Sequence, residues 1–440
     1  MKPIALILSL LFQSILWSPS SFAQQGTLME ADRHAAQARL DLVMGDNYHE
    51  IKISTFILGD DKASRLYLAT LATALERGKR VRLVVDPYQS VFPWAYLQQL
   101  VGLGLEVKVY NDYTPWSWLN PFTAFNKMNK RMHDKLFILD DSVLITGGRN
   151  VNQDYFLTLR GRNAKDGYFP FRDKDVWVEG QAAADASEYF EKLWADKNST
   201  ELRWPAISED DASIARQELR AYTEMVQKVA GSKVIPRPEM ARDAEFISNE
   251  NRKTNVATKL IEEINNAKSE ILIENPYVLL TKPMRKALED AVKRNVRVVI
   301  FTNAADRGDE GLVGKAFGED APGLIAAGME IYQLANRNTL HSKTMVIDRK
   351  VSFVGSFNLD NRSSNINRES GVLVRDEKFG QRMVEAAEKT KSLSMLMRYR
   401  GVAQKIRCDS LFGPGLAPVN EIQKLNLSDK MKVKIGRPLL

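Results

Sequence analysis

Two stretches of this 440-residue chain carry the same five chemically active residue types at the same spacing. The first copy is MHDKLFILDDSVLITGGRN, which begins at Met132, and the second is LHSKTMVIDRKVSFVGSFN, which begins at Leu340. Counted from the histidine, each copy has Lys at +2, Asp at +7, Gly at +14 and Asn at +17, and only four histidines occur in the whole chain. A repeat of this kind predicts two related structural units that contribute to the same chemistry.

The chemistry of each copy depends on a histidine and a lysine. Two residues that are two positions apart on a β-strand project from the same face, so their side chains can converge on one ligand. An imidazole can attack or donate a proton, and the ammonium beside it supplies a fixed positive charge, which together suit a phosphate. The predicted pairs are His133 with Lys135, and His341 with Lys343.

The other motif positions are interpreted from their place on the strands. Asp140 and Asp348 fall on the opposite parity to the histidines and open polar turns, which indicates a structural or indirect role. Asp175 and Glu369 lie beyond the two motifs, where a carboxylate could accept a hydrogen bond from a second ring nitrogen of histidine. Polar side chains at a glycine corner can approach a phosphate, and those predicted to bind it are Asn150, Ser356 and Asn358.

A single copy of the motif would favour a simpler interpretation. One histidine and one lysine on an apolar strand are more often a core histidine near a surface lysine. Duplicated packing alone does not require the same ionisable residue types at matching positions in both copies. The repeat therefore favours catalysis.

The paired HxK(x)4D pattern, followed by GGxN in the first copy and GSxN in the second, resembles the phospholipase D superfamily. The chain most resembles bacterial cardiolipin synthases, because Asn-Pro-Phe at 120–122 and Asn-Lys-Arg-Met-His at 129–133 precede the first motif. The resemblance implies an α/β protein of two tandem phospholipase D-like α/β/α sandwich halves with pseudo-twofold symmetry and one shared active site. The catalytic motif residues it implies are His133, Lys135, Asp140, His341, Lys343 and Asp348.

The resemblance also implies a mechanism. One histidine attacks phosphorus and forms a phosphohistidine, while the other protonates the departing alcohol and later deprotonates the acceptor. Many members of the superfamily attack with the first histidine, which makes His133 the nucleophile and His341 the acid and base. Bacterial cardiolipin synthases would also have a histidine in the loop at 303–320, and this chain has none there.

Several functions remain open at this stage. The preferred one is transfer of a phosphatidyl group to an alcohol on another phospholipid, which makes cardiolipin from a substrate such as phosphatidylglycerol. An exported phospholipase D that hydrolyses phospholipids to phosphatidic acid is a close alternative, because the two reactions differ only in the acceptor. A nuclease of the same superfamily would need a basic groove, whereas the net charge is only +7. A catalytically inactive lipid-binding protein is disfavoured by the intact histidines.

The composition bounds the cofactors and partners. The chain has one cysteine and no clustered carboxylates or histidines of the kind that hold a metal pair, so no metal and no other cofactor are expected. We expect phospholipid substrates and no nucleic-acid partner. Both motifs lie in one chain, so a monomer is sufficient.

The first residues have the pattern of a secretory signal. Lys2 is followed by an apolar run over 4–17 and small residues before Gln24, which predicts a signal peptide over 1–23. The alternative is an uncleaved anchor, but the run is shorter than the roughly 20 residues that span a bilayer. We therefore expect an exported protein, periplasmic or secreted, that associates with a membrane.

Alternating strand and helix patterns predict a mostly parallel sheet in each half. The predicted divisions are a first half over 24–205, a connecting segment over 206–245, a second half over 246–400 and a tail over 401–440, with a loop over 303–320. The stretch 112–131 has no counterpart in the second half and places aromatic residues beside Lys127, Lys130 and Arg131. It could contact a membrane peripherally or line an acyl channel, or it could be a lid packed on its own core.

Overall fold

The computed structural model describes residues 25–112, 129–156, 170–230, 239–240, 243–250, 255–304, 311–335, 338–400 and 405–409. The predictions for the signal peptide, for most of the stretch 112–131 and for residues 410–440 lie outside the described residues.

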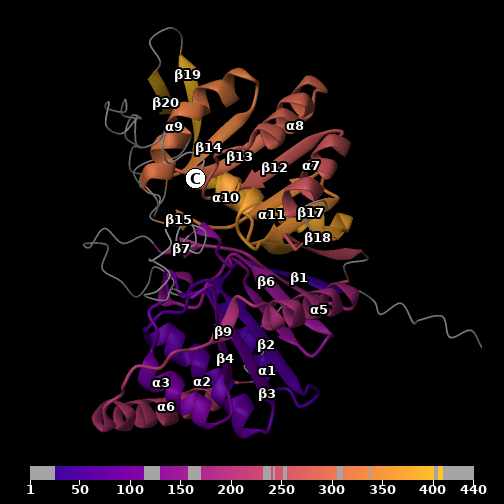
Figure 1. Cartoon of the computed structure of the whole chain (residues 1–440). Coiled ribbons are helices and arrows are strands. Elements are labelled where there is room, and N and C mark those ends of the chain that lie inside the picture. Colours follow the sequence, from indigo (N-terminus) through magenta and orange to yellow (C-terminus); the bar gives the residue numbers. More distant parts are fainter. Residues whose placement is uncertain are drawn as a thin grey trace, which may run out of the picture.

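The described chain forms two halves, each built on a nine-stranded sheet, stacked one above the other (Figure 1). The first sheet has the order β10-β1-β8-β6-β5-β2-β3-β4-β9, and the second has β11-β18-β17-β16-β12-β13-β14-β19-β20. Apart from the terminal β10 and β20, the two orders correspond strand for strand. The predicted duplication and the α/β fold are confirmed.

The strands of the first sheet are β1 (Gln25–Met29), β2 (Glu50–Thr55), β3 (Arg80–Val85), β4 (Glu106–Tyr110), β5 (Leu136–Leu139), β6 (Val143–Gly147), β8 (Asp175–Glu179), β9 (Ser199–Glu201) and β10 (Glu239–Met240). Those of the second are β11 (Ala244–Ser248), β12 (Glu270–Glu274), β13 (Arg297–Asn303), β14 (Glu330–Leu334), β16 (Thr344–Ile347), β17 (Val351–Gly355), β18 (Ser370–Arg375), β19 (Ser394–Arg400) and β20 (Lys405–Asp409). The second sheet therefore continues beyond residue 400, where the tail was predicted to begin.

The sheets are mixed, and the prediction of mostly parallel sheets is wrong. In these two sheets, only β2, β3 and β4 run parallel to one another, as do their counterparts β12, β13 and β14. Each motif instead forms a tight hairpin, β5 with β6 and β16 with β17. Strands joined by a short turn run antiparallel, because a parallel pair needs a long crossover connection.

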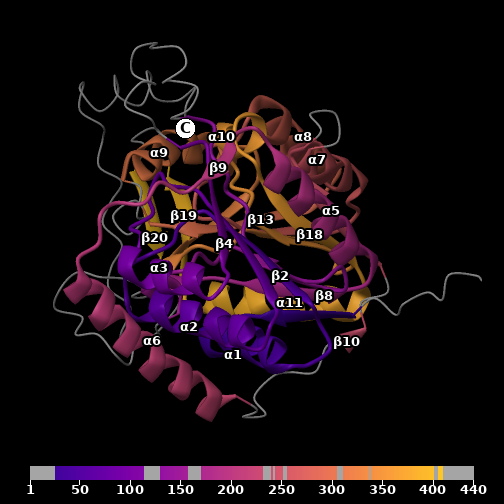
Figure 2. The same cartoon turned by 60° about the horizontal axis from the view of Figure 1, so that its bottom comes forward.

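Helices and sheets alternate in five layers. The outer face of the first sheet packs on α1 (Asp32–Met44), α2 (Lys62–Glu76) and α3 (Trp94–Gly102), and that of the second on α7 (Val256–Asn266), α8 (Lys282–Lys293) and α9 (Gly311–Ala326). Helix α6 (Glu209–Val229) packs on the outside of α2 and α3. Between the sheets lie α5 (Gln181–Ala195) and α11 (Glu377–Ser392), whose buried residues share one core with strands of both halves (Figure 2). A common core of this size holds the two halves in a fixed relation, as a shared site requires.

Local sequence patterns explain the helix packing. On α2, Leu68, Leu71 and Leu75 recur at the spacing of one helix face and are buried against the first sheet. Burying each such leucine contributes about 1.5–3 kcal/mol. Helix α6 lies within the predicted connecting segment, but it buries Ala215, Leu219 and Val226 in the core of the first half.

The predicted loop at 303–320 is partly wrong. Residues Gly311–Ala326 form α9 despite four glycines and Pro322 in that helix. Val313, Phe317 and Leu324 lie at helical spacing and are buried in the second core. Burial of this face outweighs the low helix propensity of glycine and proline.

The motif aspartates Asp140 and Asp348 stabilise turns at the end of the hairpin strands away from the histidines. Both adopt a left-handed backbone conformation, with φ of 47° and 52°. The Asp140 carboxylate accepts hydrogen bonds from the amides of His49 and Glu50, which lead into β2. Asp348 does the same for Ser269 and Glu270 at the start of β12. These contacts agree with a structural role and place neither carboxylate at the histidines.

Candidate active site

The backbone ties each motif histidine to the opposite half of the chain. The amide of His133 donates to the carbonyl of Arg368 at 2.9 Å, and the amide of His341 donates to the carbonyl of Arg172 at 2.9 Å. Beside the second contact, β7 (Phe171–Arg172) pairs in parallel with β15 (Thr339–Leu340) at the junction of the halves (Figure 1). Both histidines therefore lie at the interface of the two units.

The side chains repeat this exchange between halves. Nδ1 of His133 lies 2.9 Å from Oε2 of Glu369, and Nδ1 of His341 lies 2.7 Å from Oδ2 of Asp173. All four residues are buried. A carboxylate at Nδ1 fixes the orientation of the ring and leaves Nε2 as the nitrogen that can face a reacting atom.

The prediction that Asp175 orients a histidine is wrong, whereas Glu369 lies where it was predicted. Asp175 pairs with Gly147 across β8 and β6, and Gly371 pairs with Gly355 across β18 and β17. Asp173, two residues before Asp175, is therefore the counterpart of Glu369. The carboxylate of Asp175 instead accepts a hydrogen bond from Arg39 at 2.9 Å and lies 3.5 Å from Arg149.

The two motif lysines lie against their own histidines. Nζ of Lys135 donates to the carbonyl of His133 at 2.6 Å, and Nζ of Lys343 donates to the carbonyl of His341 at 2.5 Å. Nζ of Lys343 also lies 3.0 Å from Nε2 of His341. Burial, together with the nearby charge of Lys343, lowers the pKa of Lys135 to about 7. The two ammonium groups therefore share one buried region, which suits an anionic ligand.

The two histidine–carboxylate pairs differ electrostatically. Burial, followed by the charges of Lys135 and Lys343, lowers the pKa of His133 well below its ordinary value, so this imidazole is neutral near pH 7. Burial raises the pKa of its partner Glu369 to about 7. For Asp173, burial alone would raise the pKa, but the hydrogen bond and charge of His341 outweigh burial and lower it to about 2. A full negative charge thus stands beside His341.

The predicted phosphate-binding residues have different surroundings. The amide nitrogen of Asn150 donates to the hydroxyl of Tyr155 at 2.9 Å, while its oxygen accepts from the amide of Ile57. Among the described residues, the buried side-chain oxygen of Asn358 has no hydrogen-bond partner. The hydroxyl of Ser356 donates to Glu369 at 2.5 Å, so in this structure it orients that carboxylate.

Two aromatic residues at the second histidine were not predicted. The hydroxyl of Tyr155 lies 3.4 Å from Nε2 of His341, and the rings of Tyr155 and Phe171 each have a centroid 5.0 Å from that of the imidazole. Tyr155 lies in a short 3-10 helix, η2 (Gln153–Tyr155), just after the first motif. Tyr155 is not placed on the same face as Asn150 by the repeat of a strand or of a helix. The sequence pattern therefore did not predict that Tyr155 would contact His341.

Arg131 belongs to the stretch 112–131, which could contact a membrane, but this residue is not available for such a contact. Its guanidinium is buried and paired with the buried carboxylate of Asp86, with Nη2 at 2.6 Å from Oδ1. The same carboxylate accepts from the amide of Met132 at 2.9 Å. Arg131 therefore fixes the chain just before His133 and is not a surface cation.

Two negative findings apply to the described part of the chain. No group of three or more histidine, cysteine, aspartate or glutamate side chains is arranged to hold a metal ion there. In the same residues, no helix has both the length and the apolar character needed to cross a bilayer.

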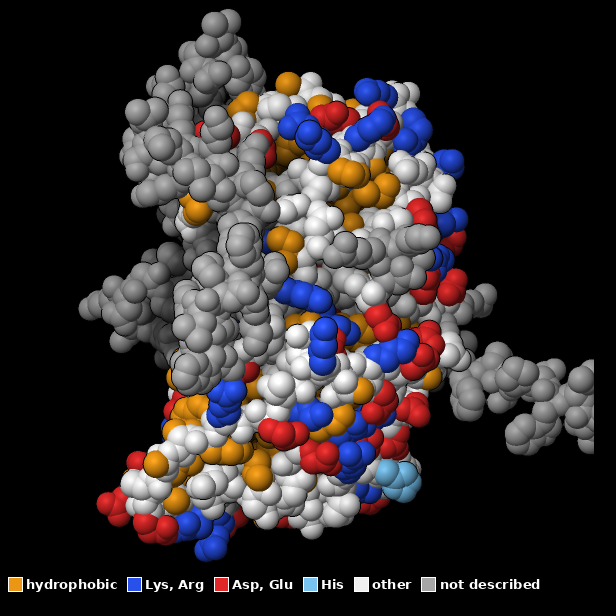
Figure 3. Space-filling view, viewed as in Figure 1, with side chains coloured by type: hydrophobic (Ala, Val, Ile, Leu, Met, Phe, Trp, Pro, Cys, Tyr) orange, Lys and Arg blue, Asp and Glu red, His pale blue; other side chains and the backbone are white. Residues whose placement is uncertain are grey.

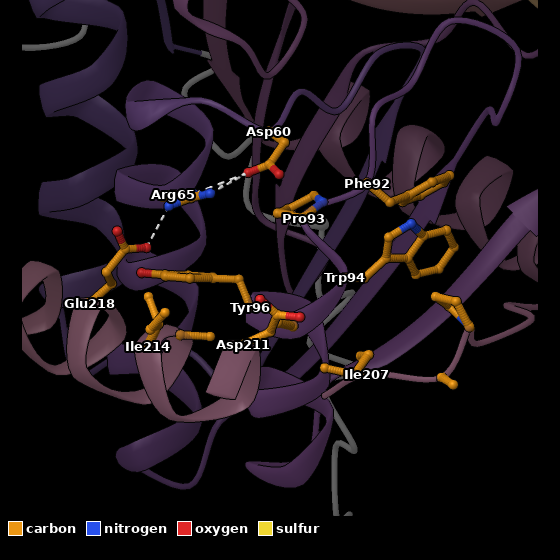
Figure 4. Close-up of a pocket in the computed structure, with 14 residues that line it drawn as sticks. Asp60, Arg65, Phe92, Pro93, Trp94, Tyr96, Ile207, Asp211, Ile214 and Glu218 are labelled. Atoms are coloured by element: carbon orange, nitrogen blue, oxygen red, sulfur yellow. Dashed lines mark hydrogen bonds and ion pairs between the residues drawn. The ribbon is translucent and has the colours of Figure 1, made fainter. Parts of the chain in front are cut away.

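A separate surface pocket of about 440 Å³ lies between α2, α3 and α6 in the first half (Figure 4). Arg65 bridges Asp60 and Glu218 on one wall, and Trp94 lies on the opposite side. Hydrophobic side chains are exposed over this part of the lower half (Figure 3), where Val91, Trp204 and Ile214 are exposed. This pocket shares no lining residue with the histidine site.

A duplicated α/β unit that supplies a histidine and a lysine from each copy to one interface defines the phospholipase D class of enzymes. The family model described as "Cardiolipin synthase, PLD-like domain" matches residues 45–194 and 260–391. The chain therefore belongs to this family, and it is an enzyme of the phospholipase D type in the phosphatidyltransferase class.

Of three similar proteins, one is named as a cardiolipin synthase. Cardiolipin synthase C of Escherichia coli K12 is 26% identical over 376 residues, which cover 76% of this chain and 78% of that protein. An uncharacterized protein of Helicobacter pylori 26695 is 25% identical over 378 residues, covering 76% of this chain and 72% of that one. The crystal structure of phosphatidylserine synthase from Haemophilus influenzae Rd KW20 has a TM-score of 0.62 at 13% identity and covers 84% of this chain and 87% of that chain. The last comparison concerns the fold alone.

Proposed function

We propose that this enzyme transfers a phosphatidyl group from one phospholipid to an alcohol on another, making cardiolipin from phosphatidylglycerol through a phosphohistidine on His133. The observation that carries the proposal is the pair of buried imidazoles, each held at Nδ1 by a carboxylate from the opposite half. The similarity to cardiolipin synthase C supports the choice of phospholipid substrates.

The electrostatic difference between the pairs supports the order of the histidines. A neutral His133 has a free electron pair at Nε2 for attack, which breaks the phosphorus–oxygen bond to the departing alcohol. The ionised Asp173 stabilises a protonated His341, which gives its Nε2 proton to that alcohol oxygen. In the second step, His341 takes the proton of the acceptor hydroxyl as its oxygen attacks phosphorus and the phosphorus–nitrogen bond breaks.

The remaining site residues would bind the nonbridging phosphate oxygens. Lys135 and Lys343 supply positive charge, and the amides of Asn150 and Asn358 supply donors. A preorganised donor at such an oxygen contributes on the order of 3 kcal/mol to the transition state. Asn150 would exchange its hydrogen bond with Tyr155 for one with the phosphate.

Burial of the site supports transfer over hydrolysis. His133 and His341 are 7% and 4% exposed, so bulk water has little access to a phosphorus bound between them. An acceptor that binds beside the phosphohistidine then competes better than free water does. We further propose that the protein acts as an exported, membrane-associated monomer; the signal-like pattern at 1–23 supports its export.

The test gives the purified full-length protein vesicles of phosphatidylglycerol, with and without phosphatidylethanolamine, and follows cardiolipin and phosphatidic acid by mass spectrometry. We expect cardiolipin from the wild type and none from His133→Ala or His341→Ala. His49→Ala is the matched control, because His49 is an exposed histidine outside both motifs. Phosphatidic acid alone would establish the hydrolase instead, and cleavage of DNA without change in the lipids would establish a nuclease.

A further inference from the structure

An apolar groove of about 540 Å³ lies on the outer helices of the first half, between α1, α2 and the end of α6. These helices come forward together in Figure 2. Its volume lies within the range of pockets that bind small molecules. Its walls include Leu40, Leu66, Leu71, Phe137, Phe156 and Val229.

The inner end of the groove lies close to the candidate active site. A small cavity shares Arg39, Phe137 and Phe156 with the groove and also contacts Lys135 and Asn150. Phe156 is adjacent in sequence to Tyr155, whose hydroxyl lies 3.4 Å from Nε2 of His341. Of these two consecutive aromatic residues, Tyr155 therefore lies at the second histidine and Phe156 lines the groove.

The charges on the groove wall are all positive. Arg33 and Lys62 are exposed lining residues, and neither has an ion-pair partner within the described ranges. Arg39 is the other charged residue of the lining, and its guanidinium is paired with Asp175. No carboxylate belongs to the described lining. An apolar groove with unpaired cations at the surface complements a molecule with a long apolar chain and an anionic end.

We propose that this groove binds one acyl chain of an anionic phospholipid whose phosphate contacts Arg33 and Lys62. The site is an accessory lipid site, separate from the histidines, and its occupancy does not depend on the transfer reaction proposed above. Exposed Met225 and Val229 at the end of α6 extend the apolar rim toward solvent, so a chain can enter from a lipid surface.

The test uses vesicles that contain phosphatidylglycerol with a photoactivatable diazirine in its acyl chain. The protein is the full-length His133→Ala variant, which prevents turnover of the probe. After irradiation, mass spectrometry of the peptides identifies the labelled residues. We expect labels on α1, α2 and α6 around the groove. The proposal would be overturned if the labels were confined to other elements. It would also be overturned if labelling did not exceed that of protein mixed with the vesicles only after irradiation.

Variants that fill the groove, compared with a control variant elsewhere, make the test specific. Ala63→Trp fills the groove and is expected to reduce its labelling at least 5-fold, whereas Ala184→Trp, at a partly exposed helical alanine on α5, leaves it unchanged. Ala36→Trp on α1 tests the same point if the first variant does not fold. Equal labelling of wild type and both groove variants would exclude this site.

The charge requirement is tested in the same way. Lys62 and Lys282 are the exposed first residues of α2 and α8, which are corresponding helices of the two halves. Arg33→Glu with Lys62→Glu should reduce labelling by phosphatidylglycerol about 10-fold, and Lys282→Glu should not. A phosphatidylcholine probe that labels the groove as strongly as phosphatidylglycerol would contradict the role given to the two cations.

Discussion

Nδ1 of His133 lies 2.9 Å from the carboxylate of Glu369, although 236 positions separate the two residues in the chain. The reverse contact, between His341 and Asp173, spans 168 positions. Each half thus supplies a histidine to the site and a carboxylate to the other half's histidine. Neither imidazole would be correctly held in an isolated half, so the common core between the sheets is a requirement of the site as well as of stability.

The exchanged carboxylates give the first prediction. Asp173→Asn and Glu369→Gln should each lower kcat about 10–100-fold with little change in KM, because partners that orient a reacting imidazole contribute about that much. Steady-state cardiolipin synthesis measures both constants. Asp175→Asn is the matched control, since that carboxylate contacts Arg39 and lies near Arg149. It should lower the melting temperature and leave kcat of the folded enzyme close to that of wild type. An equal kcat loss in all three variants would refute the assignment of Asp173.

The difference between Asp173 and Asp175 shows where inference from the sequence stops. Both residues have the same parity on an extended chain, so alternation alone could not choose between them. The choice is made by strand register, because Asp175 lies opposite Gly147 in β6, where a Cβ at the glycine would come within 2.7 Å of the Asp175 backbone. The pairing of histidine and lysine at a two-residue spacing needed no such information and could be predicted.

Other features were hidden for similar reasons. The duplicated α/β units follow from local patterns, since strands and helices alternate in the same order in both halves. Most of helix α9 was predicted as a loop because its glycines and Pro322 have low helix propensity, although its buried residues lie at helical spacing. Tyr155 reaches His341 only through the packing of one half on the other, which no local pattern encodes.

The order of the histidines gives a second prediction. A phosphodiester with a p-nitrophenol leaving group needs little help from a general acid, because the phenolate leaves without a proton. With this substrate, His341→Ala should still release p-nitrophenol in a burst and carry phosphorus covalently on His133, whereas His133→Ala should show neither. Stopped-flow absorbance and mass spectrometry of the quenched protein measure the two quantities. A phosphorylated His341 in the His133→Ala variant would reverse the roles.

A third prediction concerns the buried ion pair between Lys174 of the first half and Glu274 of the second. Their side chains are 4% and 2% exposed, and Glu274 also accepts from the hydroxyl of Ser342 at 2.7 Å. Lys174→Met leaves a buried carboxylate without its cation and should lower the free energy of unfolding by about 3–5 kcal/mol. Urea denaturation measures this change.

Two controls separate this effect from a general sensitivity to lysine loss. Combining Lys174→Met with Glu274→Gln should recover more than half of the lost stability, because the uncompensated charge is removed. Lys192→Met breaks a pair with Glu188 whose side chains are 50% and 70% exposed. Its effect should stay below about 1 kcal/mol. If the double variant were as unstable as the single one, the cost would not come from the unpaired charge.

The last prediction follows from the lowered pKa of Lys135, which is about 7 instead of 10.5. Above that pH the amine is neutral and cannot compensate the charge of a bound phosphodiester, so kcat/KM should fall as pH rises through about 7. Lys135→Arg should remove this decline, since a guanidinium keeps its proton, and Lys135→Met should lose activity about 10²–10³-fold at pH 6. Glu369 titrates in the same range, so the profile of Glu369→Gln serves as the control and should retain the decline.

The protonation of Lys135 should affect stability and activity in opposite directions: stability should rise with pH, whereas kcat/KM should fall. Between about pH 7 and 10.5 the folded protein binds fewer protons at Lys135 than the unfolded chain does, so this residue makes stability rise with pH across that window. At pH 6, folding must bury the charged ammonium, and Lys135→Met should therefore raise the melting temperature by roughly 1–3 °C while it removes activity. Thermal melts at pH 6 and pH 10 measure this change, and the gain should shrink at the higher pH. A variant that is less stable at pH 6 would mean that Lys135 contributes to the fold more than its buried charge costs.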